Sequence, residues 1–108
     1  MQYFNISNGL RGCYMPDSAH IIRCNTRREL KRALEDEAYY LRDAGFTGAS
    51  KRAVASLAAE AWRDAQQPRK KWGDFVCPLK PHGSDNASYG LFVSHSTRAD
   101  YLASMETE

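Results

Sequence analysis

Helical periodicity through the middle of the chain constrains the fold more than any other feature. Between residues 26 and 44, apolar residues recur every three or four positions, which places them on one face of an α-helix. Residues 50–67 repeat this spacing and stop before Pro68. The two apolar faces contain Leu30, Ala33, Leu34, Ala38, Leu41 and Ala44, and Val54, Leu57, Ala58, Ala61, Trp62 and Ala65. The pattern therefore predicts two consecutive amphipathic helices, each with an apolar face to bury.

The ends of both predicted helices carry local signals. Asn25 or Thr26 can cap the first helix, and Thr26 followed three residues later by Glu29 has the form of a capping box. Gly45 provides the stop, and Ser50 can cap the second helix. Glu37 is the exception on the first helix, because it projects into the apolar arc. We expect it at the edge of the packed face or paired, since a buried carboxylate without a partner is costly.

The first 24 residues have the composition of an antiparallel β-meander. Residues 3–7 favour a strand, and Asn8-Gly9 is a strong signal for a two-residue hairpin turn. The chain is then expected to return through residues 10–15, turn again, and form a third strand over residues 19–24. A three-stranded N-terminal meander is therefore predicted.

The remainder of the chain predicts a second hairpin and a last helix. Residues 72–79 and 88–94 favour strands separated by a long polar loop, and Pro78 indicates a sheet edge or a strand end because proline cannot donate to a ladder. A short helix is expected from about Thr97. The fold class is therefore predicted to be α+β, with an antiparallel sheet covered by two amphipathic helices and a short C-terminal helix.

Composition predicts one domain and no membrane span. The chain has 108 residues, of which 43% are hydrophobic and 26% charged, as in ordinary globular proteins, so residues 1–108 are expected to form a single domain. No apolar run approaches the length that a bilayer requires, and the first residues lack the features of a secretion signal. The expected location is cytoplasmic.

The cysteines and histidines do not indicate a catalytic or metal site. Cys13, Cys24 and Cys77 are odd in number and widely spaced, unlike a disulfide framework or a structural zinc site. A cysteine with His20 or His95, or Ser94 or Ser96 with His95, could pair a nucleophile with a base, but no local signature supports such a pair. We therefore expect no catalytic residue, no metal and no cofactor, with a cysteine-dependent enzyme as the minor alternative.

The first predicted helix carries its charges in the order that the helix dipole disfavours, with cations at its positive end. Four of its first six residues are cations, although the exposed N–H groups at a helix start favour anions, and three acidic residues follow at positions 35–37. Each misplaced charge costs a few tenths of a kcal/mol at an exposed site. Two interpretations remain open: a solvated face of a stable helix, or a surface that binds another macromolecule.

Two sets of residues are the candidate contacts. Arg28, Arg32, Glu35 and Tyr39 fall within one polar arc opposite the apolar stripe, and the pairs Lys31 with Glu35 and Arg32 with Asp36 have the spacing of ion pairs. The candidate partner-binding residues are Arg27, Arg28, Lys31, Arg32, Glu35, Asp36 and Tyr39. The alternative, a nucleic-acid-binding surface, would use Arg28, Arg32, Arg69, Lys70, Lys71 and Trp72, in which cations flank an aromatic ring.

Two segments of this small α+β chain of mixed charge carry a resemblance: residues 6–14 (ISNGLRGCY) and residues 92–102 (FVSHSTRADYL). In their general character they resemble the small accessory proteins of phages and prophages, among which anti-CRISPR proteins are a prominent class. This resemblance implies a stoichiometric inhibitor that needs no cofactor. It also implies a bacterial protein or ribonucleoprotein complex as the partner. The helix charges fit two modes: acidic residues such as Glu35, Asp36 and Asp43 could imitate phosphates, or the arginines could grip an acidic protein patch. The sequence specifies neither the target nor the oligomeric state.

Overall fold

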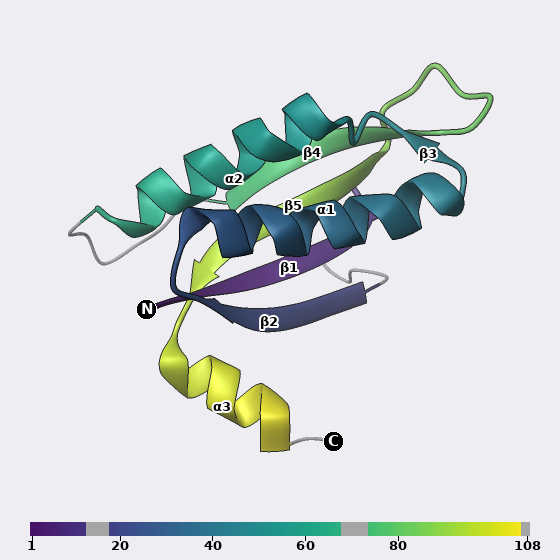
Figure 1. The fold of residues 1–108 in the computed structure, drawn as a ribbon. Helices are drawn as coiled ribbons and strands as arrows, with labels where there is room; N and C mark the ends of the chain where they lie inside the picture. Colours follow the sequence, from purple (N-terminus) through teal and green to yellow (C-terminus); the bar gives the residue numbers. More distant parts are fainter. Residues whose placement is uncertain (13–17, 68–73, 107–108) are drawn as a thin grey trace.

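The computed structural model describes residues 1–12, 18–67 and 74–106, which form a five-stranded antiparallel sheet and three helices (Figure 1). The strand order across the sheet is β2-β1-β5-β4-β3. The elements are β1 (Gln2–Leu10), β2 (Ser18–Cys24), α1 (Arg27–Asp43), β3 (Phe46–Thr47), α2 (Lys51–Ala65), β4 (Asp74–Pro81), β5 (Tyr89–Ser96) and α3 (Arg98–Glu106). The predicted α+β class with an antiparallel sheet is therefore confirmed.

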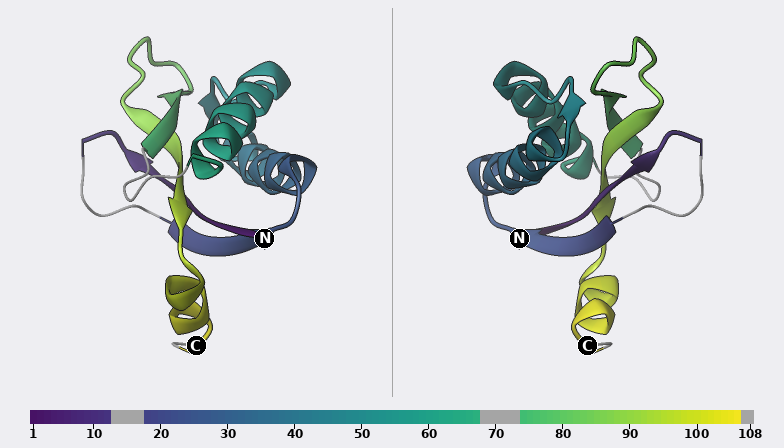
Figure 2. Two further views of the ribbon diagram at one scale, coloured as in Figure 1. Left: turned by 90° about the vertical axis from the view of Figure 1, so that its left-hand side faces the viewer. Right: turned by 90° about the vertical axis from the view of Figure 1, so that its right-hand side faces the viewer.

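Helices α1 and α2 lie side by side on one face of the sheet, and the main core fills the space between the two layers (Figure 2). Strand alternation sends every second residue toward the helices. Phe4 and Ile6 of β1 are fully buried there, and Leu30 and Leu34 of α1 meet them from above. Phe4 also stacks on Trp62 of α2, with ring centroids 5.9 Å apart. This packing fixes which face of each helix points outward.

The N-terminal three-stranded meander was a wrong prediction. Asn8 and Gly9 lie inside β1, where they pair with Leu91 and Gly90 of β5, and β1 continues to Leu10. The backbone turns after the strand, at Gly12, whose φ of 84° is in the left-handed region that glycine tolerates. Residues 13–15 of the expected second strand lie outside the described part of the chain. Up to Cys24, the described residues form two strands, paired antiparallel.

A buried polar network explains why Asn8 does not form a turn. Its side chain is on the helix-covered face and is 7% exposed. The amide Nδ2 donates to Glu37 Oε1 at 3.1 Å, and the Tyr89 hydroxyl donates to the amide Oδ1 at 3.1 Å. Glu37, the acidic residue in the apolar arc of α1, is thus paired with the sheet, one of the two arrangements expected for it.

The predicted helix starts are correct. Thr26 caps α1 by accepting the Glu29 N–H at 3.2 Å. Glu29 Oε2 reaches back to accept the N–H of Asn25 at 3.2 Å, one residue before the N–H that a capping box uses. Ser50 caps α2 by accepting the Ala53 N–H at 3.1 Å. Thr97 does the same for α3, where it accepts the Asp100 N–H at 3.1 Å. Helix α1 then ends at a glycine stop, because Gly45 has φ of 100°.

The later hairpin is present, with its strands shifted by one or two residues from the predicted ranges. The two-residue strand β3 was not predicted; it pairs with the last two residues of β4. Pro78 lies on the part of β4 that β3 does not pair with, as its missing N–H requires. Helix α3 extends away from the sheet (Figure 1). Its Tyr101 ring contacts the Tyr3 ring of β1, with ring centroids 5.2 Å apart. None of the described helices combines the length and apolarity that crossing a bilayer requires.

Candidate binding surface on helix α1

Helix α1 presents a rigidly oriented outer face. Leu30, Leu34, Ala38 and Leu41 are buried against the sheet and α2, and their three-to-four spacing forms one continuous stripe. A rotation of α1 about its axis would bring charged residues into this core and is therefore strongly disfavoured. Exposed residues of α1 consequently hold a fixed position toward solvent, with Arg28, Arg32 and Asp43 opposite the stripe and with Arg27 and Lys31 at its border. We call the following set the outer face of α1: Arg27, Arg28, Lys31, Arg32, Glu35, Asp36, Tyr39 and Asp43.

The N-terminal half of this outer face is cationic. Arg27, Arg28, Lys31 and Arg32 are all exposed. Lys31 Nζ lies 3.9 Å from Glu35 Oε1, which confirms one of the two predicted ion pairs. The other pair, Arg32 with Asp36, does not form, and no carboxylate in the described residues lies within ion-pair distance of the three guanidinium groups. Within the described part of the chain, these arginines therefore have no carboxylate that competes with an external anion.

The C-terminal half of the outer face is acidic and aromatic. Asp36 and Asp43 are exposed, and Glu35 is half-buried beside its lysine. Tyr39 and the neighbouring Tyr40 are 62% and 68% exposed, and their rings meet edge to face with centroids 5.9 Å apart. Exposed tyrosines of this kind are typical of protein interfaces, because they offer large apolar area and a hydroxyl.

The side-chain charges reinforce the dipole of the helix backbone. A helix carries partial positive charge at its N-terminus and partial negative charge at its C-terminus. In α1 the cations cluster at the N-terminal end, and the acidic residues follow toward the C-terminal end, with Glu29 and Arg42 as the exceptions. Open depressions run along the cationic half, lined by residues from Thr26 to Glu35. The structure thus brings the predicted partner-binding residues onto one polarised surface.

The nucleic-acid alternative draws on two separate parts of the chain. Arg69, Lys70, Lys71 and Trp72, which the nucleic-acid alternative requires, lie outside the described residues. The two other members of that set, Arg28 and Arg32, are both on the outer face of α1. The nucleic-acid alternative therefore stays a prediction.

The candidate nucleophile and base pairs on β5 do not assemble. His95 is opposite Phe4 in the strand register and contacts its ring, with centroids 5.6 Å apart, so the imidazole lies on the helix-covered face. Ser94 and Ser96 alternate with it and therefore point to the other face of the sheet. Burial lowers the pKa of His95, and the nearby Asp64 carboxylate partly opposes this effect. These serines are not placed for activation by this histidine.

The two described cysteines are buried thiols. Burial, with a smaller contribution from the Glu29 carboxylate, raises the pKa of Cys24 to about 11, and burial also raises the pKa of Cys77. The Cys77 thiol contacts the Gly48 carbonyl oxygen at 3.6 Å. A raised pKa is the opposite of what a cysteine nucleophile needs, because the thiolate is the reactive species.

Alkylation of Cys24 and Cys77 is expected to be slow in the native protein. At pH 8 a thiol of pKa about 11 is roughly 0.1% thiolate. We expect alkylation by iodoacetamide to be at least ~100-fold slower in the native protein than in denaturant. Mass spectrometry of the two cysteine peptides measures the rate at each cysteine separately. Fast native labelling of either one would revive the cysteine-enzyme alternative.

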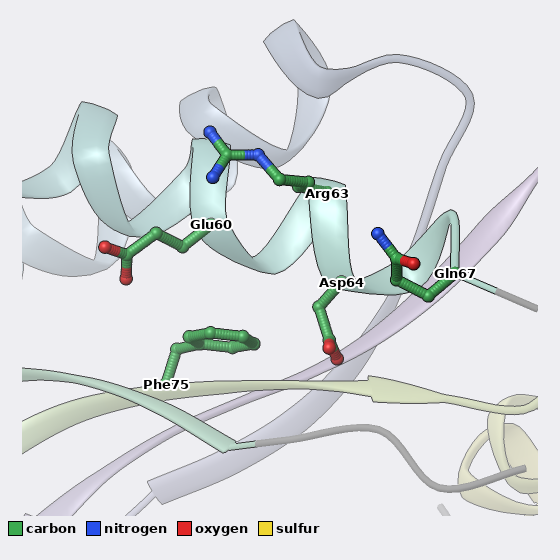
Figure 3. A pocket seen from close by; sticks show the side chains of 5 residues that line it. All are labelled: Glu60, Arg63, Asp64, Gln67 and Phe75. Atoms are coloured by element: carbon green, nitrogen blue, oxygen red, sulfur yellow. The ribbon is translucent and has the colours of Figure 1, made fainter. Parts of the chain in front are cut away.

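A small pocket at the end of α2 was missed by the sequence reasoning. Glu60, Arg63 and Asp64 line it from α2, Gln67 lines it from just beyond the helix, and the Phe75 ring lines it from β4 (Figure 3). Asp64 is 6% exposed, although it is charged. Its position seven residues after Leu57, on the apolar side of the helix, was the available signal. The pocket mixes charges of both signs and is open to solvent, so its geometry alone indicates no particular reaction.

Comparisons with known proteins add no assignment to this geometry. The outer face of α1 and the pocket beside Phe75 therefore have no counterpart of known function to compare with. No model of a protein family, no curated protein and no solved structure matches the chain.

Proposed function

We propose that this protein acts by binding another macromolecule through the outer face of α1, without chemistry of its own. The observation that carries the proposal is the exposure of Arg27, Arg28 and Arg32 on a rigidly packed helix, where no described carboxylate neutralises them. Their placement at a helix start opposes helix stability, so a role outside the fold accounts for them better than a role within it. The tyrosines further along the helix add apolar contact area.

The partner that fits this surface best is a protein region of opposite polarity. A patch with acidic groups facing Arg28 and Arg32, and basic groups facing Asp36 and Asp43, would satisfy both halves of the helix. A uniform phosphate backbone would be attracted by the first half and repelled by the second. The charge pattern thus favours a protein surface, including one within a bacterial ribonucleoprotein complex of the kind that the anti-CRISPR resemblance implies. In that setting the protein would act as an inhibitor.

Capture of a partner from bacterial lysate tests the proposal. Arg28→Glu combined with Arg32→Glu is expected to abolish capture by the immobilised protein and to leave the melting temperature unchanged or slightly raised, because anions at a helix start are favourable. The matched control is Lys51→Glu combined with Arg52→Glu, which makes the same charge change on exposed residues at the start of α2. Capture that survives the α1 substitutions, or that the α2 control abolishes equally, would contradict the proposal.

Nucleic acid remains the second candidate because the first turns of α1 concentrate four exposed cations. This function predicts a gel shift with DNA or RNA whose affinity falls steeply as salt rises, with a slope set by the number of phosphates neutralised. It also predicts that Asp36→Asn or Asp43→Asn strengthens binding, since each removes a repulsive charge. A protein partner of opposite polarity predicts weaker binding for the same two substitutions.

A further inference from the structure

The outer face of α1 is complementary in charge to a second copy of itself. At 3.6 residues per turn, Arg28, Arg32, Tyr39 and Asp43 fall within an arc of about 60°. All four side chains are exposed. Arg28 and Asp43 are placed symmetrically about a point halfway between residues 35 and 36, and Arg32 and Tyr39 are symmetric about the same point. One two-fold axis through this point, normal to the helix, therefore relates both pairs.

Such an axis places two α1 helices antiparallel and face to face. Arg28 then lies opposite Asp43 of the second copy, and the symmetry repeats this contact at the other end. Arginine and carboxylate form strong bidentate hydrogen bonds. Arg32 lies opposite Tyr39 of the second copy, where a guanidinium can stack on the aromatic ring. The two backbone dipoles also run in opposite directions, which is their favourable arrangement.

The centre of this arrangement holds like charges that the helix itself can neutralise. Glu35 and Asp36 lie nearest the axis and approach their symmetry equivalents. Each has a cation one turn earlier: Lys31 lies 3.9 Å from Glu35, and Arg32 precedes Asp36 by the same four residues without forming an ion pair with it in the single chain. The central cluster of the pair thus contains four cations and four anions, with no net charge.

We propose that this chain forms a two-fold homodimer through antiparallel pairing of α1, and that the dimer covers the surface proposed to bind the target. This inference rests on the proposed function and adds its regulation. Because the interface is one helix wide and mostly charged, the dimer is weak and sensitive to salt. Target binding then competes with self-association, so the fraction of the protein that is free to bind its target falls as the protein concentration rises.

Charge reversal on the full chain tests the dimer by sedimentation equilibrium at about 0.15 M and about 1 M salt. Arg28→Asp and Asp43→Arg are each expected to weaken dimerisation at least ~10-fold, because each converts two symmetry-related attractions into repulsions. The double variant restores both contacts with exchanged signs and is expected to dimerise like the wild type. Either substitution alone improves the charge match to the helix dipole, so unfolding does not account for a loss.

The control and the opposing outcomes are specific. Lys51→Asp, an equal charge reversal at the start of α2, is expected to leave dimerisation unchanged. A protein that stays monomeric at all concentrations, or a double variant that fails to restore the dimer, overturns the inference. Target capture that depends on Arg28 and Arg32 in a protein that stays monomeric would preserve the proposed function while overturning the dimer. Restored dimerisation without any captured target would support the dimer and contradict the proposed function.

Discussion

Gly48→Ala is expected to lower the free energy of unfolding by at least ~3 kcal/mol, one of the largest single effects in this chain. Gly48 has φ of +117°, which residues with a Cβ rarely adopt. An alanine Cβ there would lie 2.6 Å from the carbonyl oxygen of Pro78 and 3.4 Å from Leu79 Cα. These are backbone atoms of β4, so no side-chain rotation relieves the collision. Chemical denaturation of the variant measures the cost.

Gly45→Ala separates the cost of the positive φ from the cost of the collision with β4. Gly45 also has positive φ, at +100°, but an added Cβ would meet nothing closer than His82 Cβ at 3.9 Å. We expect this variant to show only the backbone cost, about 1–2 kcal/mol. A Gly48→Ala variant no less stable than Gly45→Ala would show that β4 yields easily at this contact.

The segment around Gly48 also matters for the outer face of α1. It joins the end of α1 to the start of α2, and the Arg42 guanidinium of α1 donates to the Ala49 carbonyl oxygen within it. The Cys77 thiol of β4 contacts the Gly48 carbonyl. A displaced segment would therefore shift the C-terminal end of α1, where Tyr39 and Asp43 lie. Self-association and target capture are both expected to weaken in Gly48→Ala, even at temperatures where the protein stays folded.

The helices could be predicted from the sequence because their signals are local. Apolar spacing and caps lie within one or two turns, and the capping residues Thr26 and Ser50 act on N–H groups three residues away. The exposure of Arg28 and Arg32 follows directly, since the buried stripe determines the opposite face. The order of charges along the outer face can therefore be predicted from the sequence alone.

The N-terminal strands could not be predicted because contacts distant in sequence determine them. The turn preference of Asn8-Gly9 is local, whereas the observed conformation depends on partners 29 and 81 residues away. Strand β3 is two residues long and exists only through its pairing with the end of β4. The pocket beside Phe75 likewise joins residues from α2 and β4 that no sequence spacing connects.

Asn8→Leu is expected to lower the free energy of unfolding by about 2–4 kcal/mol, because it removes the shared partner of two polar groups. Glu37 loses the donor at 3.1 Å that holds its carboxylate against the sheet, and the Tyr89 hydroxyl loses its hydrogen bond to the Asn8 amide oxygen. Leucine has the same number and branching of side-chain heavy atoms as asparagine, so the substitution leaves no cavity and the cost includes the lost hydrogen bonds. Denaturation curves for the wild type and the variant give the difference.

A double-mutant cycle with Glu37 distinguishes this network from simple packing. Once Asn8 is leucine, replacing Glu37 with leucine removes a carboxylate that has lost its donor and places an apolar side chain against another. The double variant is therefore expected to be at least as stable as Asn8→Leu alone, with a coupling of about 1–2 kcal/mol between the two positions. Tyr89→Phe, which removes the hydrogen bond to Asn8 Oδ1 and leaves the Glu37 contact in place, is expected to cost only about 1 kcal/mol. If the losses from Asn8→Leu and Glu37→Leu are additive, the pairing between the two side chains does not contribute to the stability of the protein. The pairing would then not be the reason why β1 continues through Asn8.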